Sequence, residues 1–433
     1  MTEPLPWLAP HRLTPYDGSI LVPGSKSLTN RALVLAALAD EPSVIDRPLG
    51  SRDTRLMIAA LTTLGATVAQ SVTDAGTVAW TVTPIPRDTD PAPVTIDCGL
   101  AGTVMRFAPP IAALGAARVT VDGDEQARAR PMATTIDGLR RLGVTVEDDG
   151  RDSMPFVVVG TGSVAGGPLE IDASASSQFV SALLLAAPRF DLGLDLKHTG
   201  DLLPSQPHID MTVAELRRRG VQVDTDGARW SVRPGPINGI DVGIEPDLSN
   251  AGPFIAAALV TAGRTRIQHW PTKTDQPGDH WPAITEAFGG SVERDGSDMV
   301  FTGPDNLRGV ELDLHAVGEL TPVVAAIAAL AGSSSRLTGI AHLRGHETDR
   351  LAALATEINA RGGHVTELDD GLAIEPRALH GGTFGTYHDH RMAHAGVVLG
   401  LRVPELFVEN VVTTVKTYPN FGPVWERAMT ETT

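Results

Sequence analysis

The chain has 433 residues, of which 42% are hydrophobic and 20% charged, and its formal net charge is −17. This composition is typical of a globular protein with a large core, and the length predicts two or three domains. Such acidity disfavours generic binding to nucleic acids or anionic membranes. The one cysteine, Cys98, excludes an intramolecular disulfide. With no signal-peptide pattern and no apolar run near the ~18 residues of a membrane span, we expect a cytoplasmic protein.

The segment at residues 23–31, PGSKSLTNR, runs directly into apolar residues 32–39 and predicts the start of a buried helix. The first turn of a helix leaves backbone N–H groups unpaired and carries partial positive charge, so it attracts anions. Lys26 and Arg31 add positive charge there. The spacing is not that of a P-loop. We therefore expect a phosphate site; the alternative is a capped helix with a solvated basic start.

A helical pattern followed by a glycine and a β-type residue occurs five times along the chain. The aligned glycines are 78, 77, 69 and 73 residues apart, and this near-constant period indicates internal repeats. The length corresponds to almost six such units, so we expect a sixth repeat split between the two termini. Each unit has room for helices and strands, which predicts an α/β or α+β fold. The glycines are Gly65, Gly143, Gly220, Gly289 and Gly362.

Several predicted helices begin with polar residues and continue with apolar residues on every face. A helix that is apolar all round is buried. Buried helices whose polar N-termini converge would form a floor that binds anions, whereas the alternative is a set of ordinary capped core helices. The apolar segments are residues 179–187, 251–262, 322–331 and 392–401.

Three loops before or between these helices offer further ligand candidates. Gly102 lies in DCGLAGTVMR at residues 97–106, where the backbone can approach an anion closely, although a turn would also use glycine. Arg128 and Arg130 lie just before a proline, and such a basic pair is usually solvated surface. The third loop provides hydroxyl and amide donors at a helix start, from Ser176, Ser177 and Gln178. Helix capping explains one of these polar residues, and the others are candidate ligand donors.

The densest group of ionisable residues is LRGHETDR at residues 343–350. His346 and Glu347 are candidates for acid–base chemistry, because neighbouring charges tune their pKa values. The alternative is a capped helix that carries a Glu347–Arg350 ion pair at i,i+3. A later stretch contains three histidines, His388, His390 and His394. No second set of ligands at a recognised spacing accompanies them, so we expect no metal there.

Together these motifs resemble the 5-enolpyruvylshikimate-3-phosphate synthase family of enolpyruvyl transferases. Residues 23–31 and 100–106 are similar to its first two signatures, and residues 344–351 and 389–393 to its late ones. The motifs occur in family order, and the resemblance covers almost the whole chain.

The resemblance implies an α/β fold, α+β in some schemes, with two domains. They form an inverse α/β barrel of six repeats, three per domain, with helices inside and sheets outside. One domain is discontinuous, residues 1–23 and 246–433, and carries the phosphoenolpyruvate-side and acid–base residues. The other, residues 24–245, carries the shikimate 3-phosphate side, with hinges near residues 23 and 245.

The implied reaction transfers the enolpyruvyl group of phosphoenolpyruvate to the 5-hydroxyl of shikimate 3-phosphate and releases phosphate. It uses no metal or organic cofactor. We expect the protein to be a monomer and an enzyme of the shikimate pathway, which leads to chorismate and the aromatic amino acids. The resemblance assigns shikimate 3-phosphate to Lys26, Ser27, Arg31, Ser176, Ser177, Gln178, Ser205, Glu319 and His346. It assigns phosphoenolpyruvate to Lys26, Gly102, Arg130, Arg350, Arg391 and Lys416.

The implied chemistry is an addition followed by an elimination, which needs a base for the hydroxyl proton and an acid for the C3 methylene. The resemblance places the base at Glu319, and Glu347 is our choice for the acid, with Lys26 as a rival. Because Gly102 has no side chain to crowd the phosphoenolpyruvate pocket, we expect sensitivity to glyphosate, an analogue that occupies it.

The chain departs from the family pattern at four positions. Glu319 replaces the usual aspartate, His346 stands where lysine is common, and His342 stands where asparagine is frequent. Phe107 follows Arg106 in place of a frequent proline. These changes affect the geometry of the base and one substrate contact, which becomes pH-dependent if histidine makes it.

Three alternatives differ in substrate or class. UDP-N-acetylglucosamine enolpyruvyl transferases use an Asn-containing first signature and a loop cysteine, whereas Cys98 lies before Gly102 and not in the loop at residues 128–131. RNA 3′-phosphate cyclases share such repeats, but a net charge of −17 disfavours RNA. A non-catalytic anion-binding protein on the same fold would lack a catalytic group, and the implied ones are all present.

Overall fold

The computed structural model describes residues 5–74, 76–88 and 92–430. The chain forms two compact units: unit 1 is Met1–Pro23 with Glu245–Thr433, and unit 2 is Gly24–Ile244. Within the described ranges, every helix is too short or too polar to span a lipid bilayer.

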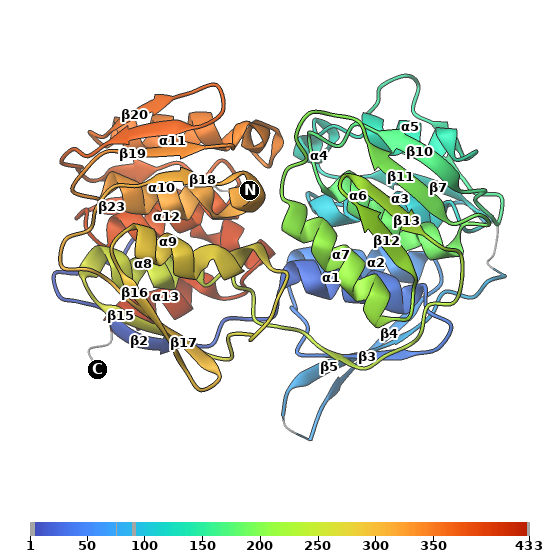
Figure 1. Cartoon of the computed structure of the whole chain (residues 1–433), viewed down its shortest axis with the longest axis horizontal. Coiled ribbons are helices and arrows are strands. Elements are labelled where there is room, and N and C mark those ends of the chain that lie inside the picture. The colour runs from blue at the N-terminus through green and yellow to red at the C-terminus, as the bar shows by residue number, and fades with distance from the viewer. Residues whose placement is uncertain (1–4, 75, 89–91, 431–433) are drawn as a thin grey trace. The chain divides into compact units, whose positions relative to one another are not determined.

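Unit 2 contains three four-stranded mixed sheets among its described residues (Figure 1). In each sheet the first two strands, taken in spatial order, are parallel and the remaining pairs are antiparallel. The sheets are β14 (Val242–Gly243), β3 (Ser43–Asp46), β5 (Val78–Thr83) and β4 (Thr67–Val72); β6 (Val94–Asp97), β7 (Arg118–Asp122), β9 (Phe156–Val159) and β8 (Thr145–Glu147); and β10 (Gly167–Ile171), β11 (Leu194–His198), β13 (Arg229–Val232) and β12 (Val223–Asp226).

Unit 1 contains two four-stranded sheets and one three-stranded sheet in the part that the structure describes. They are β16 (Ser291–Asp295), β17 (Asp298–Thr302), β15 (Arg264–Ile267) and β2 (Asp17–Ile20); β18 (Glu311–Asp313), β19 (Ser335–Thr338), β21 (Leu372–Glu375) and β20 (His364–Glu367); and β1 (Trp7–Leu8), β23 (Leu406–Val408) and β22 (Gly382–Phe384). The three-stranded sheet combines segments from both ends of the chain, where the sequence predicts a split repeat.

The five repeated glycines each lie between a helix and a strand. Their φ angles are all positive, between 82° and 111°, which is the left-handed conformation that glycine adopts without strain. The sequence prediction of a helix, a glycine turn and a strand is therefore confirmed. The helices that end at these turns are α2 (Arg52–Thr63), α5 (Ala133–Arg141), α7 (Gln206–Arg218), α9 (Trp281–Ala287) and α11 (Arg350–Ala360).

Each unit has three inner helices that pack against one another. In unit 2 they are α1 (Lys26–Ala37), α3 (Gly102–Ala112) and α6 (Gln178–Ala186); in unit 1 they are α8 (Gly252–Thr261), α10 (Thr321–Ala329) and α12 (His390–Gly400). All residues of α3, α8, α10 and α12 are buried, as their apolar sequences predict.

Short helices complete the described part of the chain. They are α4 (Glu125–Arg128), α13 (Phe421–Thr430), and the 3₁₀ turns η1 (Ala187–Arg189), η2 (Pro277–His280), η3 (His315–Leu320), η4 (Ala341–Gly345) and η5 (Val411–Lys416). Two of them, η3 and η5, contain residues that the sequence assigns to the site, Glu319 and Lys416.

Candidate active site

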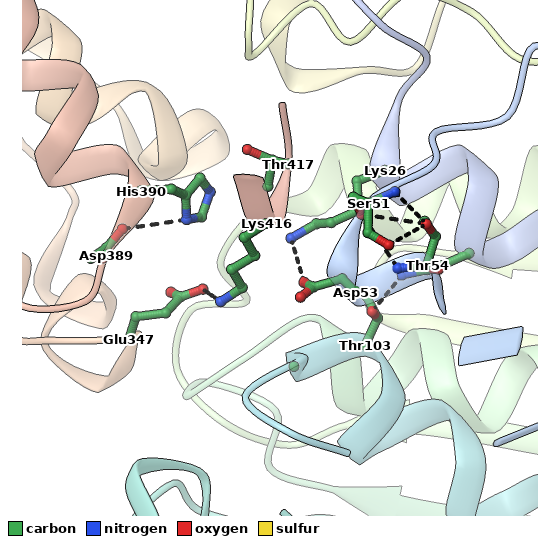
Figure 2. A network of polar contacts seen from close by, with 12 residues as sticks. Lys26, Ser51, Asp53, Thr54, Thr103, Glu347, Asp389, His390, Lys416 and Thr417 are labelled. Carbon is green, nitrogen blue, oxygen red and sulfur yellow. Dashed lines mark hydrogen bonds and ion pairs between the residues drawn. The ribbon is translucent and has the colours of Figure 1, made fainter. Parts of the chain in front are cut away.

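Helix α1 begins where the sequence predicts an anion site. Ser25 caps the helix, because its hydroxyl accepts a hydrogen bond from Leu28 N at 3.4 Å. The Lys26 ammonium lies in the first turn, 3.3 Å from Oδ2 of Asp53 in α2 (Figure 2). Asp53 is only 2% exposed, so this carboxylate holds the lysine at the helix start.

Arg31 braces the interior of unit 2. Its Nε donates to Thr212 Oγ1 at 2.8 Å and its Nη2 donates to the His208 carbonyl at 2.8 Å and Ser181 Oγ at 3.3 Å, which ties α1 to α6 and α7. The guanidinium also lies 5.5 Å from the ring centroid of Phe107. Burial lowers the pKa of Arg31 to about 10, against the raising effect of Glu215. The departure to phenylalanine in α3 thus supplies a surface beneath this arginine.

Gly102 opens α3 against two side chains from other segments. A Cβ added at Gly102 would lie 3.1 Å from Arg130 Nη1 and 3.1 Å from Gln178 Oε1. Within the described residues, these two atoms and Arg130 Nε are buried without a hydrogen-bond partner. Unpaired buried donors are costly, so the two Arg130 nitrogens are set to receive an acceptor such as an anion. Arg128, in contrast, is half exposed and pairs with Asp122 at 2.7 Å, as the surface alternative predicts.

The predicted serines lie at the starts of α6 and α7. Ser176 Oγ accepts from the Gln178 backbone N at 3.3 Å, and Ser177 is the buried residue that precedes α6. Ser205 precedes α7 with φ 54°, a left-handed conformation that is uncommon for serine. Ser27, in the first turn of α1, provides its carbonyl to Arg31 Nη1 at 3.1 Å.

The starts of the three inner helices of unit 2 converge. Asn30 of α1 donates to Thr103 Oγ1 of α3 at 2.7 Å, and Gly102 of α3 faces Gln178 of α6. A cavity of about 610 Å³ lies at the other ends of α1 and α3, where Ala37 and Ala112 line it. The residues that line this cavity include none that the sequence assigns to the site. The predicted anion-binding groups of unit 2 are therefore gathered at the N-terminal ends of its helices.

Unit 1 holds a buried network of alternating charges. Asp389 accepts from Arg350 Nε at 2.7 Å and Nη2 at 3.2 Å, and Arg350 Nη2 also donates to Glu347 Oε2 at 3.1 Å. The other oxygen of Glu347 lies 2.6 Å from Lys416 Nζ (Figure 2). Burial alone would lower the pKa of Arg350, but the charges of Asp389 and Glu347 outweigh it and raise that pKa.

Glu347 itself lies in the bend before α11 and not within the helix. The i,i+3 helical arrangement with Arg350 predicted from the sequence is therefore wrong, although the ion pair forms. The reason is Asp349, which caps α11 by accepting from Leu351 N and Ala352 N, so the helix begins three residues after Glu347.

Arg391, Ser249 and Glu319 join the starts of the inner helices of unit 1. Arg391, in the first turn of α12, donates from Nη1 to the Ser249 carbonyl at 3.1 Å, and Ser249 Oγ donates to Glu319 Oε1 at 3.3 Å. These residues stand at the starts of α12, α8 and α10. Burial lowers the pKa of Arg391, while the nearby carboxylates of Asp247 and Glu319 oppose that shift. The predicted base thus lies close to a predicted phosphoenolpyruvate-binding arginine.

Three histidines follow one another beside Glu319. The ring centroid of His342 is 5.8 Å from that of His315 and 6.0 Å from that of His346. His346 Nδ1 lies 3.8 Å from Glu347 Oε2. Burial and the neighbouring His315 and Arg350 lower the pKa of His342 to about 4 against the raising effect of Glu319. His342 is therefore neutral near pH 7 and can exchange hydrogen bonds as asparagine does.

His394, in α12, is buried with its ring centroid 4.7 Å from that of Phe421 and 6.1 Å from that of His390. Both of its ring nitrogens are buried without a hydrogen-bond partner in the described ranges. Burial, with the charges of Arg391 and Arg350, lowers its pKa well below 6.5. Across residues 5–74, 76–88 and 92–430, no three His, Cys, Asp or Glu side chains are grouped as a metal site requires.

We expect His394 to make unit 1 sensitive to acid. Below pH 6.5 the unfolded chain takes up a proton here and the folded chain does not, so the free energy of unfolding falls by about 1.4 kcal/mol per pH unit from this group. The measurement is urea unfolding at several pH values, comparing the wild type with His394→Met, which keeps an apolar side chain there. The stability difference between the two should change between pH 7.5 and pH 5.

The matched control for this prediction is His380→Gln, because His380 is an exposed histidine of the same unit. Its stability difference from the wild type is measured over the same pH range as a reference. A stability difference for His394→Met that does not change with pH would contradict the prediction.

The sequence reasoning missed several residues of these networks. Asp53 carries no motif, and only its place in the first turn of a helix distinguishes it. Asp389 was part of a recognised motif but received no role, although an aspartate directly before an apolar helix signals an N-cap. Ser249 lies in the polar stretch before the apolar segment at residues 251–262 and carries no motif of its own. Each acts through a contact with a segment far away in the chain.

Comparison with known proteins gives a consistent result. The family model for EPSP synthase (3-phosphoshikimate 1-carboxyvinyltransferase) matches residues 11–425. The chain is 58% identical over 425 residues to a Kocuria rhizophila protein named 3-phosphoshikimate 1-carboxyvinyltransferase, covering 97% of this chain and 95% of that one. Two structures of EPSP synthase from Acinetobacter baumannii share its fold, with TM-scores of 0.79 and 0.78, 22% identity, and 97% of each chain covered. The chain belongs to the EPSP synthase (3-phosphoshikimate 1-carboxyvinyltransferase) family.

Proposed function

We propose that this protein transfers the enolpyruvyl group of phosphoenolpyruvate to the 5-hydroxyl of shikimate 3-phosphate, giving 5-enolpyruvylshikimate 3-phosphate and phosphate. The observation that carries the proposal is Arg130, whose Nε and Nη1 are buried without partners beside Gly102 at the start of α3. Such a group needs an anionic acceptor. The 58% identity to a 3-phosphoshikimate 1-carboxyvinyltransferase supports the choice of substrates.

Unit 2 supplies the groups that hold the shikimate 3-phosphate side. The hydroxyl groups at the starts of α1, α6 and α7 and the ammonium of Lys26 suit a phosphate, because helix N-termini and cations both favour anions. Arg31 links α1 to α6 and α7 through hydrogen bonds, and its Nη1 can donate a further hydrogen bond. The residues proposed for this substrate in unit 2 are Lys26, Ser27, Arg31, Ser176, Ser177, Gln178 and Ser205.

Residues of each unit are proposed for phosphoenolpyruvate. Gly102 and Arg130 come from unit 2, and Lys26 serves both substrates. In unit 1 the residues proposed for phosphoenolpyruvate are Arg350, Arg391 and Lys416, all of them buried and each held by a carboxylate or a carbonyl. Cations fixed in advance stabilise charge on the departing phosphate without reorganisation.

The acid–base groups come from unit 1. Glu319 takes the proton from the 5-hydroxyl of shikimate 3-phosphate. The hydroxyl oxygen then bonds to C2 of phosphoenolpyruvate while an acid protonates C3. Phosphate then leaves C2 as a proton is lost from the C3 methyl group, which restores the methylene. Glu347 is the proposed acid at C3 and Lys26 the rival. Glu347 accepts hydrogen bonds from Arg350 Nη2 at 3.1 Å and Lys416 Nζ at 2.6 Å, so it must take up a proton before it can act as the acid.

The test of this proposal is phosphate release from shikimate 3-phosphate and phosphoenolpyruvate, with each substrate omitted in turn and no metal added. Release that requires both substrates is the expected result. UDP-N-acetylglucosamine in place of shikimate 3-phosphate tests the alternative enolpyruvyl transferase. Phosphate release with UDP-N-acetylglucosamine but not with shikimate 3-phosphate would overturn the proposed substrate. Release with neither acceptor would also overturn it.

We further propose the inverse α/β barrel arrangement of six repeats, three in each unit. Among the described residues, three sheets and three inner helices in each unit support it. A monomeric, cytoplasmic enzyme with no nucleic-acid partner agrees with the family and with the net charge of −17. Sedimentation of the purified protein tests the monomer.

Gly102→Ala should weaken phosphoenolpyruvate binding. The new methyl group would stand 3.1 Å from Arg130 Nη1 and Gln178 Oε1, closer than ordinary packing allows, so these groups must shift. We expect the KM for phosphoenolpyruvate to rise about tenfold, with the KM for shikimate 3-phosphate within about twofold. Millimolar glyphosate should inhibit the wild type strongly and the variant less.

The control for this prediction is Gly138→Ala in α5 of the same unit, where the nearest atoms would be 3.7 Å away and no clash arises. It should leave both KM values and the inhibition unchanged. A wild-type enzyme that works normally in millimolar glyphosate would contradict the expected sensitivity.

A further inference from the structure

The loop that leads into α12 holds two consecutive residues in an unfavourable conformation. Tyr387 has φ 52° and His388 has φ 56°, both in the left-handed region that residues with a side chain rarely occupy. Strain of this kind persists only where the surrounding structure enforces it, and it concentrates at functional sites. The next residue, Asp389, is fully buried and accepts from Arg350 and from the backbone N of Arg391.

Two carboxylates outside the proposed site hold this loop. Glu357 Oε2 accepts from Gly385 N at 2.9 Å, and its Oε1 accepts from the Tyr387 hydroxyl at 2.8 Å. Glu409 Oε2 accepts from Thr386 N at 2.7 Å and from Thr386 Oγ1 at 3.0 Å. Burial and both carboxylates raise the pKa of Tyr387 to about 12, so its hydroxyl remains a donor at neutral pH.

Helix α11 contacts the loop at two places. Arg350, at its first position, pairs with Asp389, and Glu357 lies seven residues later on the same face of the helix. A Cβ added at Gly385 would lie 2.7 Å from Glu357 Oε1, which shows how closely the loop backbone approaches this carboxylate. The helix therefore contacts the strained loop at Gly385 and Tyr387, and it also contacts Asp389, the residue that follows the loop.

We propose that Glu357 is a positioning residue for phosphoenolpyruvate: it holds the strained loop at residues 385–388 so that Asp389 keeps Arg350 and Arg391 in place. The link to phosphoenolpyruvate rests on the proposed function; the restraint on the loop does not. Releasing the loop relaxes the two left-handed residues, moves Asp389, and lets Arg350 and Arg391 adopt other positions. The groups proposed for shikimate 3-phosphate in unit 2 have no part in these contacts.

The first experiment is hydrogen exchange of the ligand-free protein, comparing the wild type with Glu357→Gln and Tyr387→Phe. Glu357→Gln replaces one acceptor by an amide donor, and Tyr387→Phe removes only the hydroxyl contact. We expect faster exchange of the Gly385, Thr386 and Asp389 amides in both variants, and more in Glu357→Gln. Unchanged exchange in both would overturn the restraint. Glu426→Gln, an exposed glutamate of α13, is the matched control.

The second experiment measures kinetics on the same proteins. We expect Glu357→Gln to raise the KM for phosphoenolpyruvate about tenfold and to leave the KM for shikimate 3-phosphate within about twofold. Tyr387→Phe should change the same KM by a smaller factor, and it provides the test if Glu357→Gln does not fold. A purely structural role would lower the melting temperature and leave both KM values unchanged, which would overturn the proposal.

The two proposals can fail separately. A wild-type enzyme that shows no turnover with the two substrates would refute the proposed function, whatever the exchange data show. An active wild type whose loop exchanges faster in Glu357→Gln without any change in the KM for phosphoenolpyruvate would refute only the positioning role.

Discussion

Asp389→Asn should cost about 3–5 kcal/mol of stability, the typical penalty for breaking a buried ion pair. Asp389 is 0% exposed and Arg350 is 3% exposed, so the substitution leaves a buried guanidinium with one of its two carboxylates removed. Asparagine can still accept from Arg391 N and cap α12, so the loss reports the charge and not the cap. Urea unfolding followed by tryptophan fluorescence measures the effect.

Asp349→Asn is the matched control, because both aspartates are N-caps of helices in unit 1. Asp349 pairs with Arg344 at 3.2 Å but is 38% exposed, and exposed pairs contribute only about 0–1 kcal/mol. The same chemical change should therefore be almost neutral there. Because asparagine keeps the cap at both positions, equal losses would contradict a larger contribution from the buried ion pair.

Glu319→Gln and Glu347→Gln should each lower kcat by about 10²–10⁴, the usual contribution of a general acid or base. Glutamine keeps the size of the side chain and one acceptor oxygen but cannot accept or release the proton. The KM values should change much less, because the binding cations remain. Phosphate release at saturating substrates gives kcat for each variant.

The two roles can be separated by following deuterium from solvent into C3 of phosphoenolpyruvate or product by NMR. If Glu347 is the acid, Glu347→Gln abolishes both incorporation and phosphate release. If Lys26 is the acid, Lys26→Met abolishes incorporation and Glu347→Gln only slows it. Incorporation at the wild-type rate in Glu347→Gln would remove Glu347 from the acid role. A kcat close to the wild-type value in Glu319→Gln would remove Glu319 from the base role.

Much of the fold follows from local patterns in the sequence. The five repeat glycines are positions where the backbone needs positive φ, and helices such as α8 and α10 are so uniformly apolar that only burial can accommodate them. The start of α1 was predictable because a serine cap, a lysine and an apolar run lie next to one another. These features depend on neighbouring residues, which a single sequence displays directly.

The contacts that order the candidate site depend on distant segments, and the sequence does not display them. Asp53 reaches Lys26 from the next helix, and Gly102 meets Arg130 and Gln178 only because three loops end at the same place. Glu357 looks like an ordinary charged residue of an amphipathic helix. Its partners, Gly385 and Tyr387, lie about thirty residues further along the chain. Motif resemblance identified the residues, and packing determines their partners.

The two units differ in when during translation all their strands become available for pairing. Unit 2 is continuous, from Gly24 to Ile244, so all its strands are available once that segment has emerged. Unit 1 is not: β2 must wait for β15 at Arg264–Ile267, and β1 must wait for β23 at Leu406–Val408. At about 5–20 residues per second, unit 2 has many seconds to fold before unit 1 can close its last sheet. Vectorial synthesis therefore favours one order of folding, in which the first strands made are among the last to be paired.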